Sequence, residues 1–310
     1  MATTSRKKTQ KQFDGPKPEE VLVADLVSLL ESGTSPWQRP WSGTDGIHRN
    51  LITGEPYRGA NPLLLEAGLA LRQQSIPLWI GVGQAKEHGW FPRKGSKSVR
   101  IFRPQLNKKE TGELDKNGDP EITAWVSFKV IPVFHVMDLD ANSEEAAQDL
   151  RKKINDACNR EIQAESVRIE NAEQVLESWP VKVNFGSNKA FYLPSTDEIT
   201  LPSVEQFHNR ESYVATRAHE AAHSTGHKSR LARDLYSDFG SIGYAREELI
   251  AEMASVLICN RLQVSYQLEQ HASYLKSWAD ILSEGGSKVL FSVLKQAKQA
   301  ADLIIAELES

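Results

Sequence analysis

The stretch YVATRAHEAAHSTGH, from Tyr213 to His227, decides how the second half of the chain is organised. It contains His219, Glu220 and His223 in the order H-E-x-x-H. Residues four apart on an α-helix lie on the same face, so both imidazoles can reach one ion. Glu220 is close enough to take a proton from a water molecule at that ion. This pattern is typical of zinc peptidases, in which two histidines bind the metal and the glutamate is the general base.

Such a site needs a third ligand. The metzincin spacing would place a histidine at position 229, where this chain has Ser229, so that class is excluded. The alternative is a glutamate on a second helix, which we predict over Ala245–Asn260. Glu248 is the predicted third ligand of Zn²⁺ or another divalent ion, and Glu252, four residues on, is predicted to orient a ligand histidine. Glu247 stays open as the alternative ligand, since glutamates at a helix start also complement its dipole.

Short β-strands are predicted directly before the H-E-x-x-H helix. They cover Val181–Phe185, Lys189–Leu193 and Glu198–Leu201. A small sheet in this position is the usual scaffold of zinc peptidases, and its edge strand can pair with an extended peptide. We predict that Ile199–Leu201 is that edge. Tyr236 and Tyr244, in the loop that follows the helix, are candidates for stabilising an oxyanion.

The first half of the chain mixes helical and strand patterns. Helices are predicted for Pro18–Ser32 and Leu63–Gln74, and strands for Ser98–Arg103 and Thr123–Asp138. The polar segment Asn107–Pro120 is predicted to be a hairpin tip. The fold class is therefore α+β with two domains: 18–140, then a linker helix in 141–165, then 166–310. Residues 1–17 form a basic tail that we expect to be disordered.

Charge and tryptophan are distributed unevenly. The first 140 residues carry 19 Lys and Arg against 16 Asp and Glu, and five of the seven tryptophans. The segment Lys86–Lys109 has eight basic residues and one acid, with aromatic residues between them. Proteins that bind single-stranded nucleic acid combine cations for phosphates with aromatic faces for bases. A solvated hairpin whose aromatic residues are core explains the composition equally well.

Several classes of protein are excluded or disfavoured. No apolar run approaches the length of a membrane span, and the basic N-terminus MATTSRKKTQKQ lacks the apolar region of a secretory signal. Two cysteines do not suggest a disulfide framework. We therefore expect a cytoplasmic protein with no membrane partner.

Blocks of sequence spread over about residues 18–280 resemble the ArdC-type antirestriction proteins of conjugative plasmids and other mobile elements. In the first half they are PWQRPW (36–41), TGEPYRGANPLLL (53–65), the segment Trp79–Gly89, RKGSKS (93–98) and FHVMD (134–138). In the second half they are AFYLPSTDEITLP (190–202), HEAAHSTGH (219–227), RLARD (230–234) and YAREELIAE (244–252).

The resemblance implies a domain that binds single-stranded DNA, joined to a zincin-like metallopeptidase domain that contains the small sheet, the H-E-x-x-H helix and the glutamate helix. It implies protection of incoming DNA from host restriction during conjugation. The residues predicted to contact DNA are Trp37, Arg39, Trp41, Tyr57, Arg58, Trp90, Arg93, Lys94, Lys97, Arg100 and Arg103. Two alternatives stay open: a zinc metalloprotease that acts on a host protein and uses DNA binding for targeting, or a DNA-binding protein that a metal stabilises without catalysis.

Overall fold

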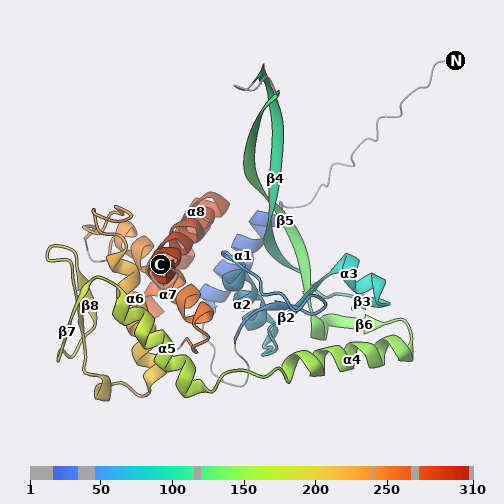
Figure 1. Ribbon diagram of the computed structural model, residues 1–310, viewed down its shortest axis with the longest axis horizontal. Helices are drawn as coiled ribbons and strands as arrows, with labels where there is room; N and C mark the ends of the chain where they lie inside the picture. Colours follow the sequence, from blue (N-terminus) through green and yellow to red (C-terminus); the bar gives the residue numbers. More distant parts are fainter. Residues whose placement is uncertain (1–16, 34–45, 115–119, 239, 267–271, 307–310) are drawn as a thin grey trace.

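The computed structural model describes residues 17–33, 46–114, 120–238, 240–266 and 272–306. Helices and strands form the body of the molecule, and one long hairpin projects from it (Figure 1). The mixture of helices with separate small sheets confirms the predicted α+β class. Trp37, Arg39, Trp41 and the tail up to residue 16 lie outside the described residues, so what the sequence predicts for them stays a prediction.

The first half of the chain begins with a helix that has Pro18 in its first turn, where a proline costs no hydrogen bond. Its elements are α1 (Pro18–Glu31), β1 (Arg49–Asn50), α2 (Asn61–Arg72), β2 (Leu78–Gly81), α3 (Val82–Glu87), β3 (Trp90–Pro92), β4 (Val99–Leu114), β5 (Pro120–His135), the 3-10 turn η1 (Val136–Asp138) and β6 (Leu139–Ala141). The two predicted helices are present within two residues of the predicted bounds.

The main sheet has the strand order β1-β2-β5-β4, with β1 and β2 parallel and the other pairs antiparallel. Helix α2 lies directly on this sheet because Gly68 allows a close approach. A Cβ atom at Gly68 would come within 2.4 Å of Val99 and 2.9 Å of Trp79. The first half of the chain therefore has a closely packed sheet and helix at its centre.

Strands β4 and β5 form the projecting hairpin. Their ladder runs from Val99↔Val133 to Leu114↔Pro120, whereas β2 pairs with β5 only near its end, at Val133, Phe134 and His135. The prediction of a polar tip over Asn107–Pro120 was therefore wrong in extent, because strand β4 continues to Leu114 and pairs regularly with β5 as far as Glu110. Its polar composition reflects a ribbon that meets solvent on both faces.

Helix α4 (Glu144–Cys158) lies within the segment predicted as a linker. It starts at Ser143, whose hydroxyl caps the Ala146 N–H. Leu150 on this helix joins a small second core with Ile80, Trp90 and Leu139. The linker helix is therefore attached to the first half of the molecule by apolar packing.

The second half of the chain contains a second, smaller sheet and the longest helices. Its elements are α5 (Glu165–Ser178), β7 (Lys182–Phe185), β8 (Phe191–Leu193), β9 (Glu198–Leu201), the 3-10 turn η2 (Val204–Gln206), α6 (Arg210–Ser224), α7 (Ile242–Arg261) and α8 (Ala272–Ala306). The three predicted strands are all present. Gly286, which has φ +57°, interrupts α8.

The edge of this small sheet is not the predicted one. The strand order is β7-β9-β8, so β9, which contains Ile199–Leu201, is the central strand. It pairs with β7 in parallel on one side and with β8 antiparallel on the other. The prediction was wrong because the last strand in the sequence is inserted between the two earlier ones. Strand β8 is the edge that lies next to α6.

One hydrophobic core runs through both halves of the chain. It includes Leu26 of α1 and Leu63 of α2 together with Leu249 of α7 and Leu290 of α8. Helix α1 packs along α8, and α7 lies between α6, α8 and α2 (Figure 1). The two halves of the sequence are therefore joined by shared apolar packing. In the described part of the chain, every helix is too short or too polar to cross a membrane.

We expect Leu26→Ala to lower the free energy of unfolding of the whole chain by about 2–5 kcal/mol, because it leaves a cavity in the shared core. The matched control is Leu71→Ala on α2, where the leucine is exposed and the expected change is within about 0.5 kcal/mol. Urea denaturation, followed by tryptophan fluorescence and by circular dichroism, measures both. A separate second transition that Leu26→Ala leaves unchanged would contradict the shared core.

Candidate metal centre and nucleic-acid surface

Helix α6 carries the H-E-x-x-H motif in the interior of the molecule. Asn209 caps the helix by accepting a hydrogen bond of 2.8 Å from the Ser212 N–H. Val214, Ala218 and Ala222 pack into the core and fix the helix against α7. The small alanines let the two helices approach closely. The motif therefore sits on a rigid and buried scaffold.

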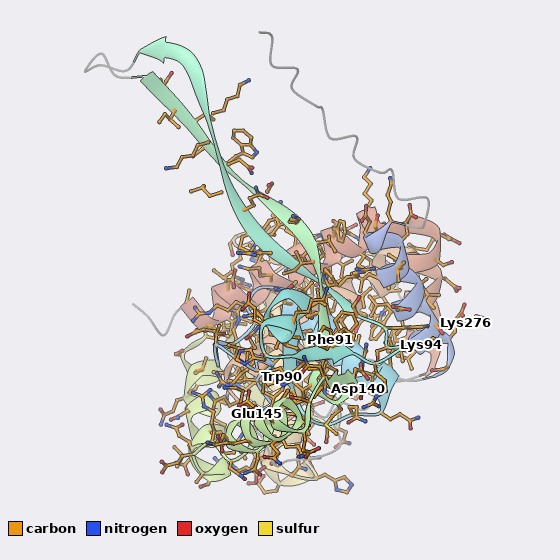
Figure 2. All side chains as sticks on the ribbon, turned by 90° about the vertical axis from the view of Figure 1, so that its right-hand side faces the viewer. Trp90, Phe91, Lys94, Asp140, Glu145 and Lys276 are labelled. Carbon is orange, nitrogen blue, oxygen red and sulfur yellow. The ribbon has the colours of Figure 1, made fainter. Side chains whose placement is uncertain are left out.

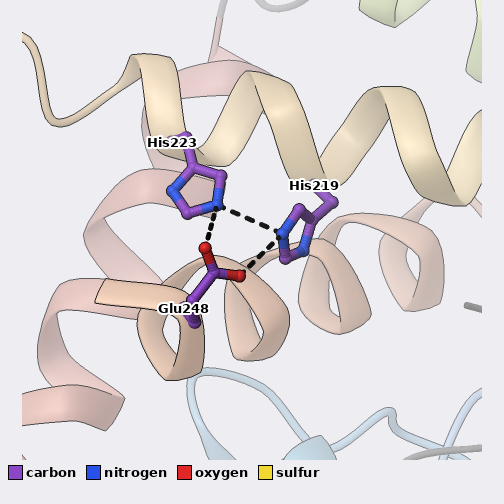
Figure 3. Close-up of side chains that lie close together, drawn as sticks. All are labelled: His219, His223 and Glu248. Atoms are coloured by element: carbon purple, nitrogen blue, oxygen red, sulfur yellow. Dashed lines mark hydrogen bonds and ion pairs between the residues drawn. The ribbon is translucent and has the colours of Figure 1, made fainter. Parts of the chain in front are cut away.

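Three side chains converge at the contact between α6 and α7. The Nε2 atoms of His219 and His223 are 3.1 Å apart. The carboxylate of Glu248 faces both of them, at 3.5 Å from His219 Nε2 and 3.7 Å from His223 Nε2 (Figure 3). These ligand atoms all lie within 4.8 Å of one another. The structure thus brings together the three residues that the sequence predicted as metal ligands.

Glu247 has a different position from Glu248. Its Oε1 atom is 3.2 Å from His223 Nδ1, on the side of the ring that faces away from Glu248. Arg233 donates two hydrogen bonds to the same carboxylate, at 2.7 and 2.9 Å. Glu247 is therefore already engaged in holding the imidazole. This geometry favours Glu248 over Glu247 as the third ligand.

Glu252 occupies the corresponding place behind His219. Its Oε2 atom is 3.8 Å from His219 Nδ1 and accepts a hydrogen bond of 2.5 Å from the Tyr266 hydroxyl. Burial raises the pKa of Glu252 to about 7. Each candidate ligand histidine thus has a carboxylate near its second nitrogen, an arrangement that orients metal-bound imidazoles.

The predicted general base, Glu220, is buried beside the two histidines. Burial raises the pKa of its carboxyl group, and this outweighs the opposite effect of the imidazoles. Glu220 lines a cleft of about 390 Å³ together with His219, Tyr192 on the edge strand β8, and Tyr244. A carboxylate in such surroundings is a stronger proton acceptor than an exposed one.

The residues present fit a divalent cation. Four buried or nearly buried carboxylates, those of Glu220, Glu247, Glu248 and Glu252, surround the histidines. Among the described residues, the buried arginine or lysine side chain that pairs with them is Arg233, which contacts Glu247. Buried charges of one sign are costly unless they are compensated. His219 Nδ1 and Glu252 Oε1 are also buried without a hydrogen-bond partner in the described part of the chain. Nitrogen and carboxylate donors of this kind suit zinc and manganese.

The two tyrosines proposed for oxyanion stabilisation lie in different places. Tyr244 lines the cleft, and its hydroxyl is 3.2 Å from that of Tyr274. Tyr236 is exposed and does not line the cleft. Sequence reasoning missed the supporting roles of Arg233 and Tyr266. The RLARD block was a signal for Arg233, but nothing near Tyr266 in the sequence indicates its contact with Glu252.

Three of the predicted DNA-binding residues lie together. Tyr57, Arg58 and Arg103 line a groove of about 1290 Å³ at the base of the projecting hairpin. Tyr57 and Arg58 come from the loop before α2, and Arg103 comes from β4. The side chains of Arg58 and Arg103 are exposed. This group combines an aromatic ring with cations, as the sequence predicted.

The other described cations of the prediction lie on a separate part of the surface. Arg93 is paired with Asp140 at 3.2 Å on the neighbouring strand β6. Burial raises the pKa of Asp25 on α1, and the nearby positive charges of Lys97 and Arg100 oppose this rise. Lys94 lies on the body of the molecule, away from the projecting hairpin (Figure 2). The predicted residues therefore do not form one continuous surface.

Trp90 was predicted to stack on bases, and the structure contradicts this. Its side chain is fully buried in the small second core. The indole N–H donates to the carbonyl of Ala146 at 2.8 Å, and the ring stacks on His88. Strand β3 pairs with β6 and turns this ring inward, so Trp90 has no face to offer a ligand.

Two family models match separate parts of the chain. The N-terminal domain of anti-restriction factor ArdC matches residues 17–134. A zincin-like metallopeptidase model matches residues 170–295, which confirms the predicted zincin-like fold of the second half. The boundary between the two matches falls within the segment that contains α4.

The chain is also similar to two DNA primases named TraC from Escherichia coli. One is 35% identical over 303 residues, which cover 94% of this chain and 27% of the primase. The other is 33% identical, with 93% of this chain and 20% of the primase covered. The chain therefore spans about a quarter or less of the length of these curated relatives.

Solved structures of the antirestriction ArdC protein from the R388 plasmid match nearly the whole chain. The metal-free structure has a TM-score of 0.66 at 28% identity and covers 94% of this chain and 97% of its own. The Mn(II)-bound structure has a TM-score of 0.63 at 28% identity, with coverage of 93% and 97%. Together, the two domain matches and the similarity along the full length show that the chain belongs to the ArdC-type antirestriction family, with an ArdC N-terminal domain and a zincin-like metallopeptidase domain.

Proposed function

We propose that this protein binds single-stranded DNA and protects incoming DNA from host restriction during conjugation, and that its zincin-like domain holds a divalent ion at a peptidase-type site. The observation that carries the metal site is the convergence of His219, His223 and Glu248 from two buried helices. The observation that supports DNA binding is the groove with Tyr57, Arg58 and Arg103, in the region that matches the ArdC N-terminal domain.

His219, His223 and Glu248 would hold the ion, with Zn²⁺ as the first choice. A divalent ion in this place polarises a carbonyl and lowers the pKa of a bound water molecule. Glu220 would accept the proton of the attacking water and return it to the leaving amine. Glu247, at 3.2 Å from His223 Nδ1, and Glu252, at 3.8 Å from His219 Nδ1, would orient the two imidazoles from behind.

An extended peptide would lie along strand β8, which borders the cleft. Phe191 and Tyr192 of this strand line the cleft opposite the H-E-x-x-H helix. Within the described part of the chain β8 is an edge strand, so one of its sides is not paired with another strand. Pairing of a substrate backbone with this edge would bring its carbonyl group next to Glu220. The second candidate function, proteolysis of a host protein with DNA binding as a targeting device, is favoured by this intact catalytic geometry.

We expect Glu248→Ala to abolish stoichiometric binding of Zn²⁺ and Mn²⁺, because the site loses one of its three ligands. Glu247→Gln should keep the metal but bind it about 10- to 100-fold more weakly, since Glu247 supports His223 without facing the ion. Glu205→Gln, an exposed glutamate on η2, is the control. Isothermal titration calorimetry measures all three. If Glu247→Gln lost the metal and Glu248→Ala still bound it, Glu247 and not Glu248 would be the third ligand.

The full chain should bind a labelled single-stranded oligonucleotide more tightly than the matching duplex. Phosphate contacts make the affinity fall with salt, and the slope of log K against log[salt] changes by about 0.7 for each phosphate contacted on a single strand. With three or four contacts the expected slope is about −2 to −3. Fluorescence anisotropy at several salt concentrations measures it. Equal affinity for both DNA forms, or no binding at low salt, would refute the proposed DNA partner.

Glu220→Gln separates DNA protection from hydrolysis. We expect this variant to bind the metal like the wild type and to protect incoming DNA in a restricting host equally well. Any hydrolysis of unfolded protein substrates should fall by about 10²- to 10⁴-fold, which is the usual contribution of a general base. Conjugation efficiency into restricting and non-restricting hosts is the readout. Loss of protection, with metal and DNA binding intact, would make proteolysis of a host protein the primary function.

A further inference from the structure

We propose that single-stranded DNA runs through the groove at the base of the β4–β5 hairpin, and that helix α8 from the second half of the chain forms one wall of this site. The proposal rests on the proposed binding of single-stranded DNA and assigns its location. It also extends the site beyond the region that the ArdC N-terminal model covers, since α8 begins at Ala272.

The groove offers aromatic faces from both halves of the molecule. Phe128 on β5 lines it and is 67% exposed, which is unusual for a phenylalanine in a folded protein. Phe291 on α8 and Phe102 on β4 meet edge to face at 5.3 Å between ring centroids. This contact attaches the hairpin to α8. Aromatic rings that are only partly covered are the platforms on which bases of a single strand stack.

Cations surround these rings. Arg58, Arg103, Lys295 and Lys298 line the groove, and Glu19 is the one acid among the described lining residues. Lys298 lies over the loop before α2 and forms an ion pair with Asp302, so its charge is partly compensated. Arg58, Arg103 and Lys295 have no ion-pair partner among the residues that the structure describes. The groove therefore matches a polyanion in the sign of its charge.

The hairpin itself contains an uncompensated charge pair. Arg103 on β4 is directly opposite Lys129 on β5 in the ladder. Like charges directly opposite one another destabilise a pair of strands. On the same face of the ribbon and further out, Trp125 is 47% exposed and Lys109 lies opposite Thr123. Lys129 and Trp125 face the other side of the ribbon from Phe128, because side chains alternate along β5. A phosphate bound at Arg103, which lines the groove, would relieve the repulsion between Arg103 and Lys129.

These observations favour nucleic acid over a protein as the occupant. An apolar peptide would cover Phe128 but would leave Arg103 and Lys295, which line the same groove, uncompensated. A single strand satisfies both features, because its bases stack on the rings while its phosphates approach the cations. On the β3–β4 loop, which carries Lys94, the charge of Arg93 is already compensated by an ion pair with Asp140.

The test is anisotropy of a labelled 20-nucleotide oligo(dT) titrated with the full chain. Lys295→Glu should weaken binding and reduce the magnitude of the salt slope by about 0.7, because one phosphate contact is lost. Phe128→Ala should weaken binding about 5- to 150-fold by removal of one stacking platform. Lys152→Glu, an exposed lysine on α4, is the control for the change of charge and should bind like the wild type.

The outcomes separate this inference from the function on which it rests. If the wild type binds oligo(dT) and the groove variants bind equally well, while Lys94→Glu binds weakly, the DNA lies on the β3–β4 loop and the groove proposal is wrong. If only Lys295→Glu binds like the wild type, the contribution of α8 is refuted. If the wild type does not bind at low salt, the proposed DNA binding itself fails. Thermal denaturation of each variant shows that a lost affinity is not a lost fold.

Discussion

The burial of several carboxylates on one helix is the constraint on which the rest of this structure depends. Helix α7 is buried at every position from Ala251 to Cys259, yet it carries Glu252 within this stretch and Glu247 and Glu248 just before it. A buried charge without compensation is so costly that the surrounding chain must supply partners. Arg233 and Tyr266 supply two of them, and the histidines of α6 supply the others. The divalent ion that we propose completes this compensation.

The same helix explains why the two halves of the sequence are not independent bodies. Helix α7 must be covered by apolar surface along its second half, and α8 and α2 provide it. Helix α8 in turn packs against α1 from the beginning of the chain. The ArdC N-terminal region thus contributes part of the wall that holds the metallopeptidase helices. This shared packing accounts for a groove that takes residues from both regions.

The parts of the fold that were predicted from the sequence are those encoded by local patterns. Two histidines four residues apart define a helix face, and their partners Glu248 and Glu252 repeat the same spacing on the next long helix. The structure brings all of these side chains together. The three strands before the H-E-x-x-H helix were also predicted from their local sequence patterns. In each case a few adjacent residues contain the physical reason for the structure.

The predictions that failed depend on contacts between distant residues. The sequence suggested that Trp90 is an exposed ring among cations. The pairing of β3 with β6 instead places its side chain in the small second core. Strand β9 was expected at the edge, although its order in the sheet is set by pairing with β7. The polar residues in the outer part of β4 suggested a hairpin tip. They form a strand instead, because a two-stranded ribbon that is exposed on both faces does not need an apolar face. The sequence could not decide between Glu247 and Glu248 as the third ligand. That choice depends on Arg233, which lies in another segment of the chain and donates hydrogen bonds to Glu247.

Helix α8 connects the two candidate sites and also keeps them apart. Tyr274 at its beginning lines the metal cleft, and Phe291 and Lys295 further along line the groove. The cleft and the groove share no lining residue, and the break at Gly286 lies between these two parts of α8. A strand of DNA in the groove therefore does not occupy the cleft that contains Glu220. The two sites can be filled at the same time, and a peptide at β8 would leave the DNA groove open. This separation is what allows substitutions at Glu220 and at Lys295 to test the two activities independently.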